Sequence, residues 1–139
     1  MPKLDSLEPD FQPLVTELLT KVNAATGRTW GISDGRRTMA QQKAIFAQGR
    51  TAPGKVVSNA PPGSSAHNFG LAVDIWPMKD GDFDWTAPDD MFHIMADIAV
   101  SMGLTAGYFF HSIHDAPHVE TPRWKTQQAL WRSGKLEVA

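Results

Sequence analysis

Residues 65–76 of the chain read SAHNFGLAVDIW, a polar segment that leads into an apolar one. It places an imidazole, His67, seven residues before a carboxylate, Asp74. Residues 71–76 are apolar apart from Asp74, which predicts a buried strand. An ionised carboxylate in such a run is costly unless it is paired or binds a metal ion. Gly70 also permits a close approach of the loop to the strand. Together with the buried carboxylate and the nearby imidazole, this leads us to expect a metal site here. The simpler alternative is a loop histidine and a hydrogen-bonding aspartate.

A second carboxylate and imidazole occur at Asp115 and His118, beside an apparent short strand at 117–120. Two histidines and one aspartate form the ligand set of many catalytic zinc sites, which keep a fourth position for water. Bound zinc brings the pKa of water to about 7, and an unligated carboxylate can move its proton to the leaving amine. Asp115 is the candidate for this general base. The alternative is a capping or turn aspartate before Pro117.

Arg37 lies between a predicted strand and a predicted helix. Its guanidinium could polarise a scissile carbonyl or hold a carboxylate, and the alternative is a solvated loop arginine. Residues 51–65 form a long stretch rich in Gly, Pro, Ser and Asn that runs directly into His67. A loop of this length in a compact domain is usually functional or disordered, so we expect it to form part of the site.

The composition is that of an ordinary globular domain, with 42% hydrophobic and 20% charged residues. A length of 139 residues predicts a single domain spanning 1–139. The net charge of −2 gives no support for nucleic-acid binding through a basic surface. The absence of cysteine excludes disulfides, thiolate zinc ligands and a cysteine nucleophile. We expect no signal peptide and no membrane insertion, because neither pattern is visible.

Hydrophobic periodicity and end signals predict several short helices and strands. Their mixture, without βαβ regularity, favours an α+β fold over a parallel α/β sheet. We expect the helix that begins near residue 91 to be capped around Asp89 or Asp90. The predicted helices span 10–22, 38–48, 91–102 and 124–132, the predicted strands span 29–33, 71–76 and 117–120, and a turn-rich hairpin or loop covers 80–85.

Four motifs resemble those of the LAS-type zinc peptidases, the group that contains lysostaphin, the D-Ala-D-Ala peptidases and the hedgehog signalling domain. Within this group the chain is most similar to phage endolysins and bacterial enzymes that act as L-alanyl-D-glutamate peptidases. The motifs are GRRT at 35–38 followed by Gln42, QGRTAPG at 48–54, the Ser-x-His-x-x-Gly-x-Ala-x-Asp signature at 65–74, and Asp-x-Pro-His at 115–118.

The resemblance implies a small antiparallel sheet that carries a zinc site, with helices packed on its other side. It implies that Asp115 acts as general base and then as acid, that Arg37 stabilises the oxyanion or holds substrate, and that Ser65 contacts substrate near the metal. It also implies that one zinc ion is bound by two histidines and an aspartate, namely His67, Asp74 and His118.

Two positions depart from the family pattern. Arg36 stands where an aromatic residue is usual, which we expect to alter substrate packing. Residues 107–111, GYFFH, replace a Gly-Gly-Asp-Trp-like segment, so we expect a different substrate wall that keeps an aromatic side chain.

Other conspicuous side chains have simpler interpretations. We expect His111 and His114 to lie at the rim of the site without binding metal. Trp124 and Trp131 have a spacing that suits core packing better than carbohydrate binding.

These observations predict a zinc metallopeptidase that hydrolyses a peptide bond in the peptidoglycan stem, namely an L-Ala-D-Glu endopeptidase of the phage endolysin type. One alternative is a D-Ala-D-Ala carboxypeptidase or dipeptidase with the same ligands. Another is a non-catalytic, zinc-stabilised binding module, against which Asp115 argues because a structural site needs no spare base. We expect a monomer that resides in the host cytoplasm before release to the cell wall or periplasm.

Overall fold

The computed structural model describes residues 2–139. A five-stranded antiparallel sheet has the order β1-β2-β5-β4, and β3 pairs with the far end of β2. The strands are β1 (Trp30–Asp34), β2 (Ala72–Lys79), β3 (Asp82–Phe83), β4 (Thr105–Ala106) and β5 (His118–Glu120). The helices are α1 (Pro2–Asp5), α2 (Gln12–Thr26), α3 (Met39–Ala47), α4 (Asp89–Ser101) and α5 (Trp124–Arg132), with short 3-10 helices η1 (Ala66–Phe69) and η2 (Gly107–Phe109). The α+β prediction is confirmed.

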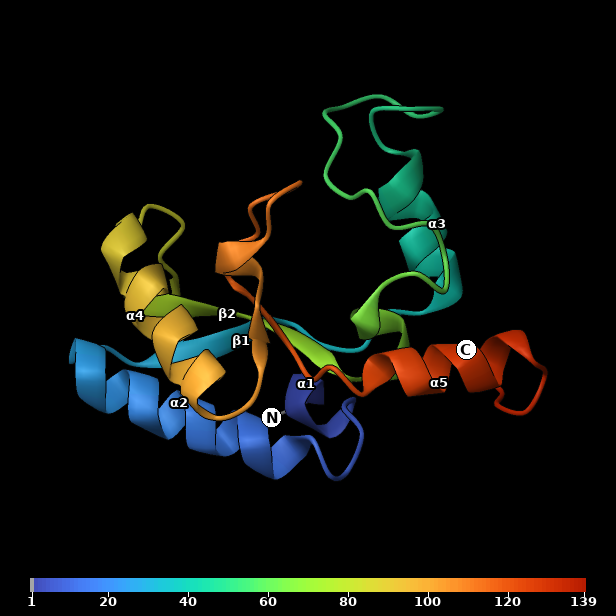
Figure 1. Cartoon of the computed structure of the whole chain (residues 1–139). Coiled ribbons are helices and arrows are strands. Elements are labelled where there is room, and N and C mark those ends of the chain that lie inside the picture. The colour runs from blue at the N-terminus through green and yellow to red at the C-terminus, as the bar shows by residue number, and fades with distance from the viewer. Residues whose placement is uncertain (1) are drawn as a thin grey trace.

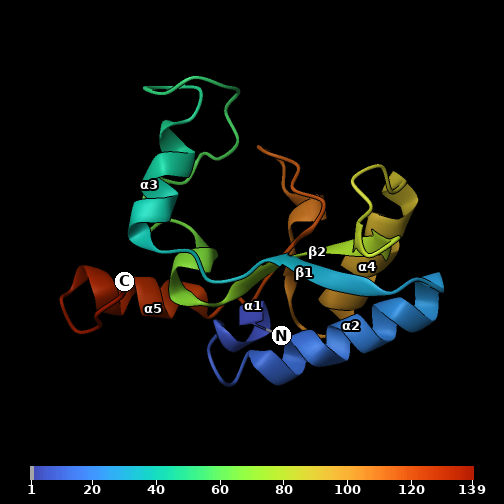
Figure 2. The ribbon, with the colours of Figure 1, turned by 180° about the vertical axis from the view of Figure 1, so that it is seen from behind.

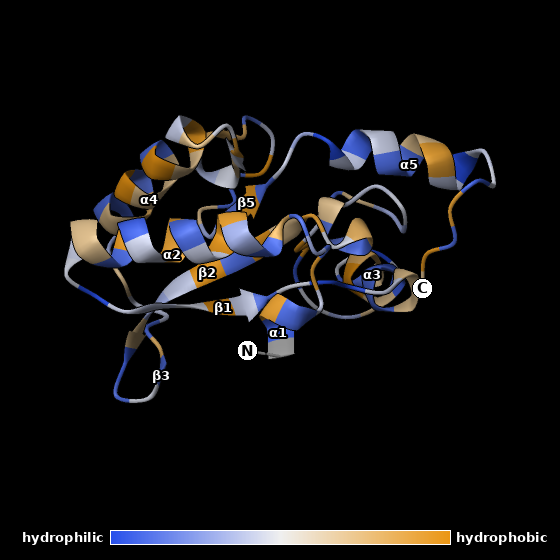
Figure 3. Ribbon diagram, turned by 90° about the horizontal axis from the view of Figure 1, so that it is seen from below, coloured by the Kyte–Doolittle hydropathy of each residue, from blue (hydrophilic) through white to orange (hydrophobic). Residues whose placement is uncertain are grey.

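The sheet separates a hydrophobic core from the side that carries the polar residues. The core side holds the cross-strand pairs Ile32–Ile75 and Val73–Val119, which are all buried. α2 runs beneath this side, whereas α3 and the loop that follows it stand above the sheet (Figures 1 and 2). Seen from below, hydrophobic and hydrophilic segments alternate along α2, as expected of a helix that buries one face (Figure 3).

Most predicted helices occur where the periodicity placed them. α2 ends at Gly27, whose φ of 67° is the left-handed conformation typical of a helix C-terminus. α3 begins after Thr38, whose side chain accepts a hydrogen bond from the backbone N–H of Gln41 in a capping box. α5 has the predicted bounds. The sequence therefore contained both the periodicity and the end signals of these helices.

The structure corrects two details of the prediction. The residue before α4 is Pro88, without a side-chain cap, while Asp89 and Asp90 lie in the first turn, where their charge favours the helix dipole. β2 continues beyond the predicted end at Trp76, through Pro77, and pairs with β3 in the hairpin expected at 80–85. No helix in the described part of the chain has the length and apolar character needed to span a membrane.

Candidate metal centre

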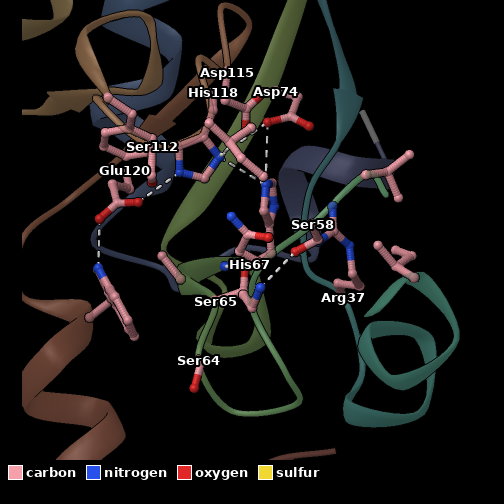
Figure 4. A pocket seen from close by; sticks show the side chains of 18 residues that line it. Arg37, Ser58, Ser64, Ser65, His67, Asp74, Ser112, Asp115, His118 and Glu120 are labelled. Carbon is pink, nitrogen blue, oxygen red and sulfur yellow. Dashed lines mark hydrogen bonds and ion pairs between the residues drawn. The ribbon is translucent and has the colours of Figure 1, made fainter. Parts of the chain in front are cut away.

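Three side chains from separate segments meet on the upper side of the sheet. η1 carries His67, β2 carries Asp74, and β5 carries His118 directly opposite Asp74 in the strand register. His67 Nε2 lies 3.3 Å from Asp74 Oδ1 and 3.2 Å from His118 Nδ1. The third side of this triangle, from His118 Nδ1 to Asp74 Oδ1, measures 3.3 Å. Figure 4 shows the three groups pointing toward one another.

The triangle has the dimensions of a metal site. Ligand atoms about 2.05 Å from a tetrahedral zinc ion are separated from one another by about 3.3 Å, close to the three distances observed. Three protein ligands would leave one tetrahedral position open, as in catalytic zinc sites. Within residues 2–139, these are the only three His, Cys, Asp or Glu side chains arranged to hold a metal ion.

Hydrogen bonds fix which nitrogen each histidine presents to the centre. His67 Nδ1 lies 2.7 Å from the carbonyl oxygen of Gly35, so this nitrogen carries the proton and Nε2 is left for a ligand. His118 Nε2 donates to Glu120 Oε1 at 2.7 Å, which leaves its Nδ1 for the centre. Glu120 is in turn held by Trp124, whose Nε1–H donates to Oε2 at 2.6 Å. Such outer partners orient metal-binding histidines.

The charges at the centre are coupled. Burial by itself lowers the pKa of His118, but hydrogen bonds to Asp74 and Glu120 outweigh it and raise that pKa to about 10. Burial by itself raises the pKa of Asp74, but hydrogen bonds from His118 and His67 hold it below its usual range. In the absence of a metal ion, His118 is therefore a cation between two carboxylates.

Asp115 stands beside the triangle rather than in it. Its Oδ2 lies 3.7 Å from His118 Nδ1, beyond hydrogen-bonding distance, and its side chain is 42% exposed. Burial raises the pKa of the Asp115 carboxyl group, and the negative charge of Asp74 raises it further. The backbone holds this residue in place, because its N–H donates to the carbonyl of Gly107 at 3.0 Å. Asp115 thus offers a carboxylate that lines the cleft and is hydrogen-bonded to neither histidine.

Arg37 is fixed in the wall of the site and is not a solvated loop arginine. Its guanidinium pairs with Asp34 and donates to Gln42 Oε1 at 2.8 Å. Gln42 is fully buried, and its amide nitrogen donates to the carbonyl of Ala60 at 2.7 Å. The backbone N–H of Arg37 also donates to the carbonyl of His67 at 2.9 Å. These bonds join the Arg37 loop, α3 and the long loop into one support for the guanidinium.

Ser65 and Arg36 have different surroundings. Ser65 lies at the start of η1, where its Oγ accepts a hydrogen bond from the backbone N–H of His67 at 3.3 Å, and it lines the cleft. Arg36 does not line the cleft: its Nε donates to the carbonyl of Ser6 at 2.7 Å, and its guanidinium pairs with Glu8 and packs on Gly70. The expectation that Arg36 alters substrate packing is therefore wrong, because the side chain turns toward α1 and its neighbouring turn.

A cleft of about 520 Å³ opens onto the candidate metal centre. The cleft is lined by Ile45 of α3, by residues 57–60, and by Phe110, Ser112 and Ile113. The segments that carry these residues rise above the sheet on either side (Figure 1). Trp124 lines the cleft and also stacks on Phe69, with ring centroids 6.2 Å apart. Trp124 therefore packs against Phe69, as its spacing predicted, and also forms part of the cleft surface. His114 lies apart from the triangle, exposed and 3.9 Å from Asp89.

Sequence reasoning missed Glu120. The available signal was its position two residues after His118 in a predicted strand, because alternate residues of a strand lie on the same face. The sequence did not reveal that Trp124, at the start of the next helix, binds the other oxygen of Glu120.

Comparison with known proteins supports the family resemblance. The family model described as VanY D-alanyl-D-alanine carboxypeptidase matches residues 5–127. The peptidoglycan L-alanyl-D-glutamate endopeptidase CwlK of Bacillus subtilis (strain 168) is 31% identical over 123 residues, which cover 80% of this chain and 73% of that protein.

Solved structures share the fold. The L-Ala D-Glu endopeptidase ChiX of Serratia marcescens matches with a TM-score of 0.60 and 20% identity, over 90% of this chain and 87% of that one. The D,D-pentapeptidase VanY of a VanB-type resistance cassette, in complex with Zn(II), matches with a TM-score of 0.60 and 18% identity, over 92% of this chain and 79% of that one.

Proposed function

This chain belongs to the VanY D-alanyl-D-alanine carboxypeptidase family. We propose that it is a zinc-dependent peptidase that cuts the L-Ala–D-Glu bond of the peptidoglycan stem. The observation that carries the proposal is the triangle of His67, Asp74 and His118 with the carboxylate of Asp115 beside it. Similarity to CwlK supports the choice of bond. A phage endolysin role stays a prediction from the sequence resemblance.

The two histidines and Asp74 would hold the zinc ion. When bound, zinc supplies a Lewis acid that polarises a carbonyl and lowers the pKa of water. The hydrogen bonds of His67 and His118 point Nε2 of the first and Nδ1 of the second at the centre, and Nδ1 of His118 loses its proton when the ion binds. The protein therefore arranges its ligands before the ion arrives.

Asp115 handles the proton in the proposed reaction. Its carboxylate accepts a proton from the attacking water and delivers it to the nitrogen of the leaving amine. The raised pKa of this carboxyl group suits both steps, because a base with a pKa nearer the working pH also returns the proton readily. The carboxylate of Asp115 is only partly buried at the cleft, which gives both water and substrate access to it.

Arg37 stabilises the oxyanion that forms when the carbonyl is attacked. A guanidinium has five N–H donors, so Arg37 keeps donors for substrate while it binds Asp34 and Gln42. Because those two partners hold the side chain still, little reorganisation is needed as charge develops. Ser65, which lines the same cleft, would contact the substrate near the metal.

The cleft also favours an internal bond over a C-terminal one. A carboxypeptidase must hold the terminal carboxylate of its substrate with cations or N–H donors. Among the cleft-lining residues of the described chain, Arg37 is the only Lys or Arg, and the proposed reaction uses its remaining donors on the oxyanion. A D-Ala-D-Ala carboxypeptidase or dipeptidase, which the family name favours, is the second candidate.

Digestion of purified peptidoglycan, followed by mass spectrometry of the products, tests the proposal. We expect cleavage after L-Ala that stops with a chelator and returns with added zinc, and that His118→Ala abolishes. Release of terminal D-Ala alone would instead establish the carboxypeptidase. A zinc-loaded wild type that binds peptidoglycan but produces no fragments would establish a binding module.

A further inference from the structure

Three aromatic side chains form a patch at the hairpin of β2 and β3. The rings of Trp76 and Trp85 lie 4.8 Å apart between centroids, and those of Phe83 and Trp85 lie 5.4 Å apart. Trp85 is 58% exposed, more than any other large hydrophobic residue among residues 2–139. An aromatic side chain held by its neighbours and left open to solvent is typical of a binding surface.

The patch lies on the side of the sheet that carries the candidate metal centre. Alternate residues of a strand share a face, so Trp76 and Met78 follow Asp74 along the same side of β2. Phe83 pairs with Met78 across the hairpin and belongs to this side as well. The Cα atoms of Asp74 and Trp76 are separated by about 7 Å, which is two residues of strand.

The patch and the cleft extend in opposite directions from Asp74. Glu120 pairs with Ala72, which precedes Asp74 on β2, and Glu120 lines the cleft. Trp76 follows Asp74, on the way to the hairpin. A substrate whose scissile bond lies at Asp74 therefore has one side in the cleft and the other side directed toward Trp76 and Trp85.

The polar groups around the patch suit a neutral, hydroxyl-rich ligand. Asp84 accepts hydrogen bonds from Arg28 at 3.0 Å and from the Thr86 hydroxyl at 2.8 Å, next to Trp85 in the chain. Asp80 and Asp82 add negative charge to the same turn, which disfavours an anionic lipid surface. A pyranose ring fits both features, because its C–H groups pack on the electron-rich aromatic face while its hydroxyls reach the carboxylates.

We propose that Trp76 and Trp85 form a subsite for the N-acetylhexosamine strand of peptidoglycan, next to the bond that is cut. The inference rests on the proposed function, because only one alanine and a lactyl group separate the L-Ala–D-Glu bond from the sugar. These two units span roughly 7 Å, which matches the step from Asp74 to Trp76. The cleft then holds the peptide on the D-Glu side of the bond.

Kinetics on two matched substrates test this subsite. One substrate is a GlcNAc–MurNAc disaccharide carrying the stem peptide, and the other is the same peptide with an N-acetyl group in place of the sugars. Trp85→Ala should lower the ratio of kcat/KM for the sugar-bearing over the sugar-free substrate about three- to tenfold, the size of one aromatic contact. Val100→Ala, which removes an exposed apolar side chain from α4, should leave the ratio unchanged. An unchanged ratio in Trp85→Ala overturns the subsite.

A binding measurement on the wild-type protein tests the subsite without relying on catalysis or on the folding of the alanine variant. A peptide-free (GlcNAc–MurNAc)2 strand, with its lactyl carboxyl groups converted to amides and added to wild type, should shift the indole N–H resonance of Trp85, assigned with Trp85→Phe. If the Trp85 resonance does not shift at millimolar concentrations of the strand, the subsite is overturned. An equal shift of all tryptophan resonances would overturn it as well. A (GlcNAc)4 control shows whether the lactyl group contributes. If wild type binds the strand but does not cut after L-Ala, the proposed function fails and the sugar site stands.

Discussion

Glu120 determines which nitrogen of His118 faces the other ligands. It accepts the Nε2 proton of His118 with one oxygen and the indole N–H of Trp124 with the other. A glutamine can accept only one of these bonds, and its NH₂ group would then face the remaining donor. We therefore expect Glu120→Gln to lower zinc affinity about 10- to 100-fold, as loss of such outer partners does elsewhere.

Competition with a chelating dye measures that change in affinity. Glu137→Gln, at an exposed position near the C-terminus, is the matched control and should bind zinc like wild type. Equal affinities of Glu120→Gln and wild type would show that the ring of His118 is oriented without its carboxylate partner.

Asp115 separates catalysis from metal binding. Asp115→Asn removes the group that takes up the proton but leaves all three proposed ligands in place, since Asp115 lies outside the triangle. We expect kcat to fall about 10²- to 10⁴-fold, the usual contribution of a general base. Zinc content, measured by atomic absorption, should stay at one ion per chain. A variant that loses its zinc instead would make Asp115 a ligand.

The sequence was most informative about residues whose role depends on local spacing. His67, Asp74 and Ser65 lie within one signature, and the structure brings His118 and Arg37 to the same place. The direction of a side chain just beyond the end of a strand depends on the elements packed around it, and some of these are too short to be recognised in the sequence. Arg36 was misplaced for this reason: it turns toward Ser6, in a turn after a four-residue helix that the periodicity did not predict.

Gly107 sets the approach of η2 to β5. A Cβ atom at this position would lie 2.4 Å from the carbonyl oxygen of Asp115 and 2.9 Å from Cβ of His118. Gly107→Ala must therefore displace the segment that carries both the proposed base and a proposed ligand. We expect the free energy of unfolding to fall by about 1–3 kcal/mol, the usual cost of overpacking, together with a loss of activity in the folded protein.

Urea unfolding and peptidoglycan digestion measure these two effects. Gly103→Ala is the control for backbone strain, because Gly103 has a φ of 81° with open space at the Cβ position. It should cost about 1 kcal/mol of stability through its left-handed conformation while keeping full activity below its unfolding midpoint. Full activity in Gly107→Ala would mean that the segment absorbs the methyl group without moving Asp115.

At the scale of elements, long periodic segments were predictable and short paired ones were not. α2, α3 and α5 have both periodicity and end signals. β4 is a two-residue edge strand, too short for an alternating pattern, and it forms only by pairing with β5. β2 extends past Pro77 because tertiary partners replace the missing donor: the carbonyl of Pro77 accepts from Asp84 at 2.8 Å, and Met78 donates to Thr29 at 2.8 Å.

At the scale of the whole molecule, the proposed zinc ion would connect η1, β2 and β5, which come from distant parts of the chain. Binding to the folded state alone stabilises a protein, so removal of zinc should lower the melting temperature as well as stop hydrolysis. The pH dependence of this stabilisation follows from His118. Its pKa rises from 6.5 to about 10 on folding without metal, because Asp74 and Glu120 accept its protons.

A raised pKa stabilises the metal-free fold below pH 6.5, and this stabilisation is lost as the pH rises toward about 10. Over the same range zinc binds more tightly, because Nδ1 of His118 must lose its proton to become a ligand. The melting temperature of the zinc-free protein should therefore fall with pH, and the difference between zinc-loaded and zinc-free protein should widen.

Scanning calorimetry between pH 6.5 and pH 9, with zinc or with a chelator, measures this difference. At a fixed pH, zinc binding should release up to one proton per ion, because the ion displaces the Nδ1 proton of His118. Titration calorimetry in buffers of different ionisation enthalpy measures this release. His118→Gln cannot become a cation, so its zinc-free melting temperature should lack the part of the pH dependence that His118 causes. A difference that stays constant with pH in wild type would mean that the two carboxylates do not hold a proton on His118, and that the ligand is already in its metal-binding form.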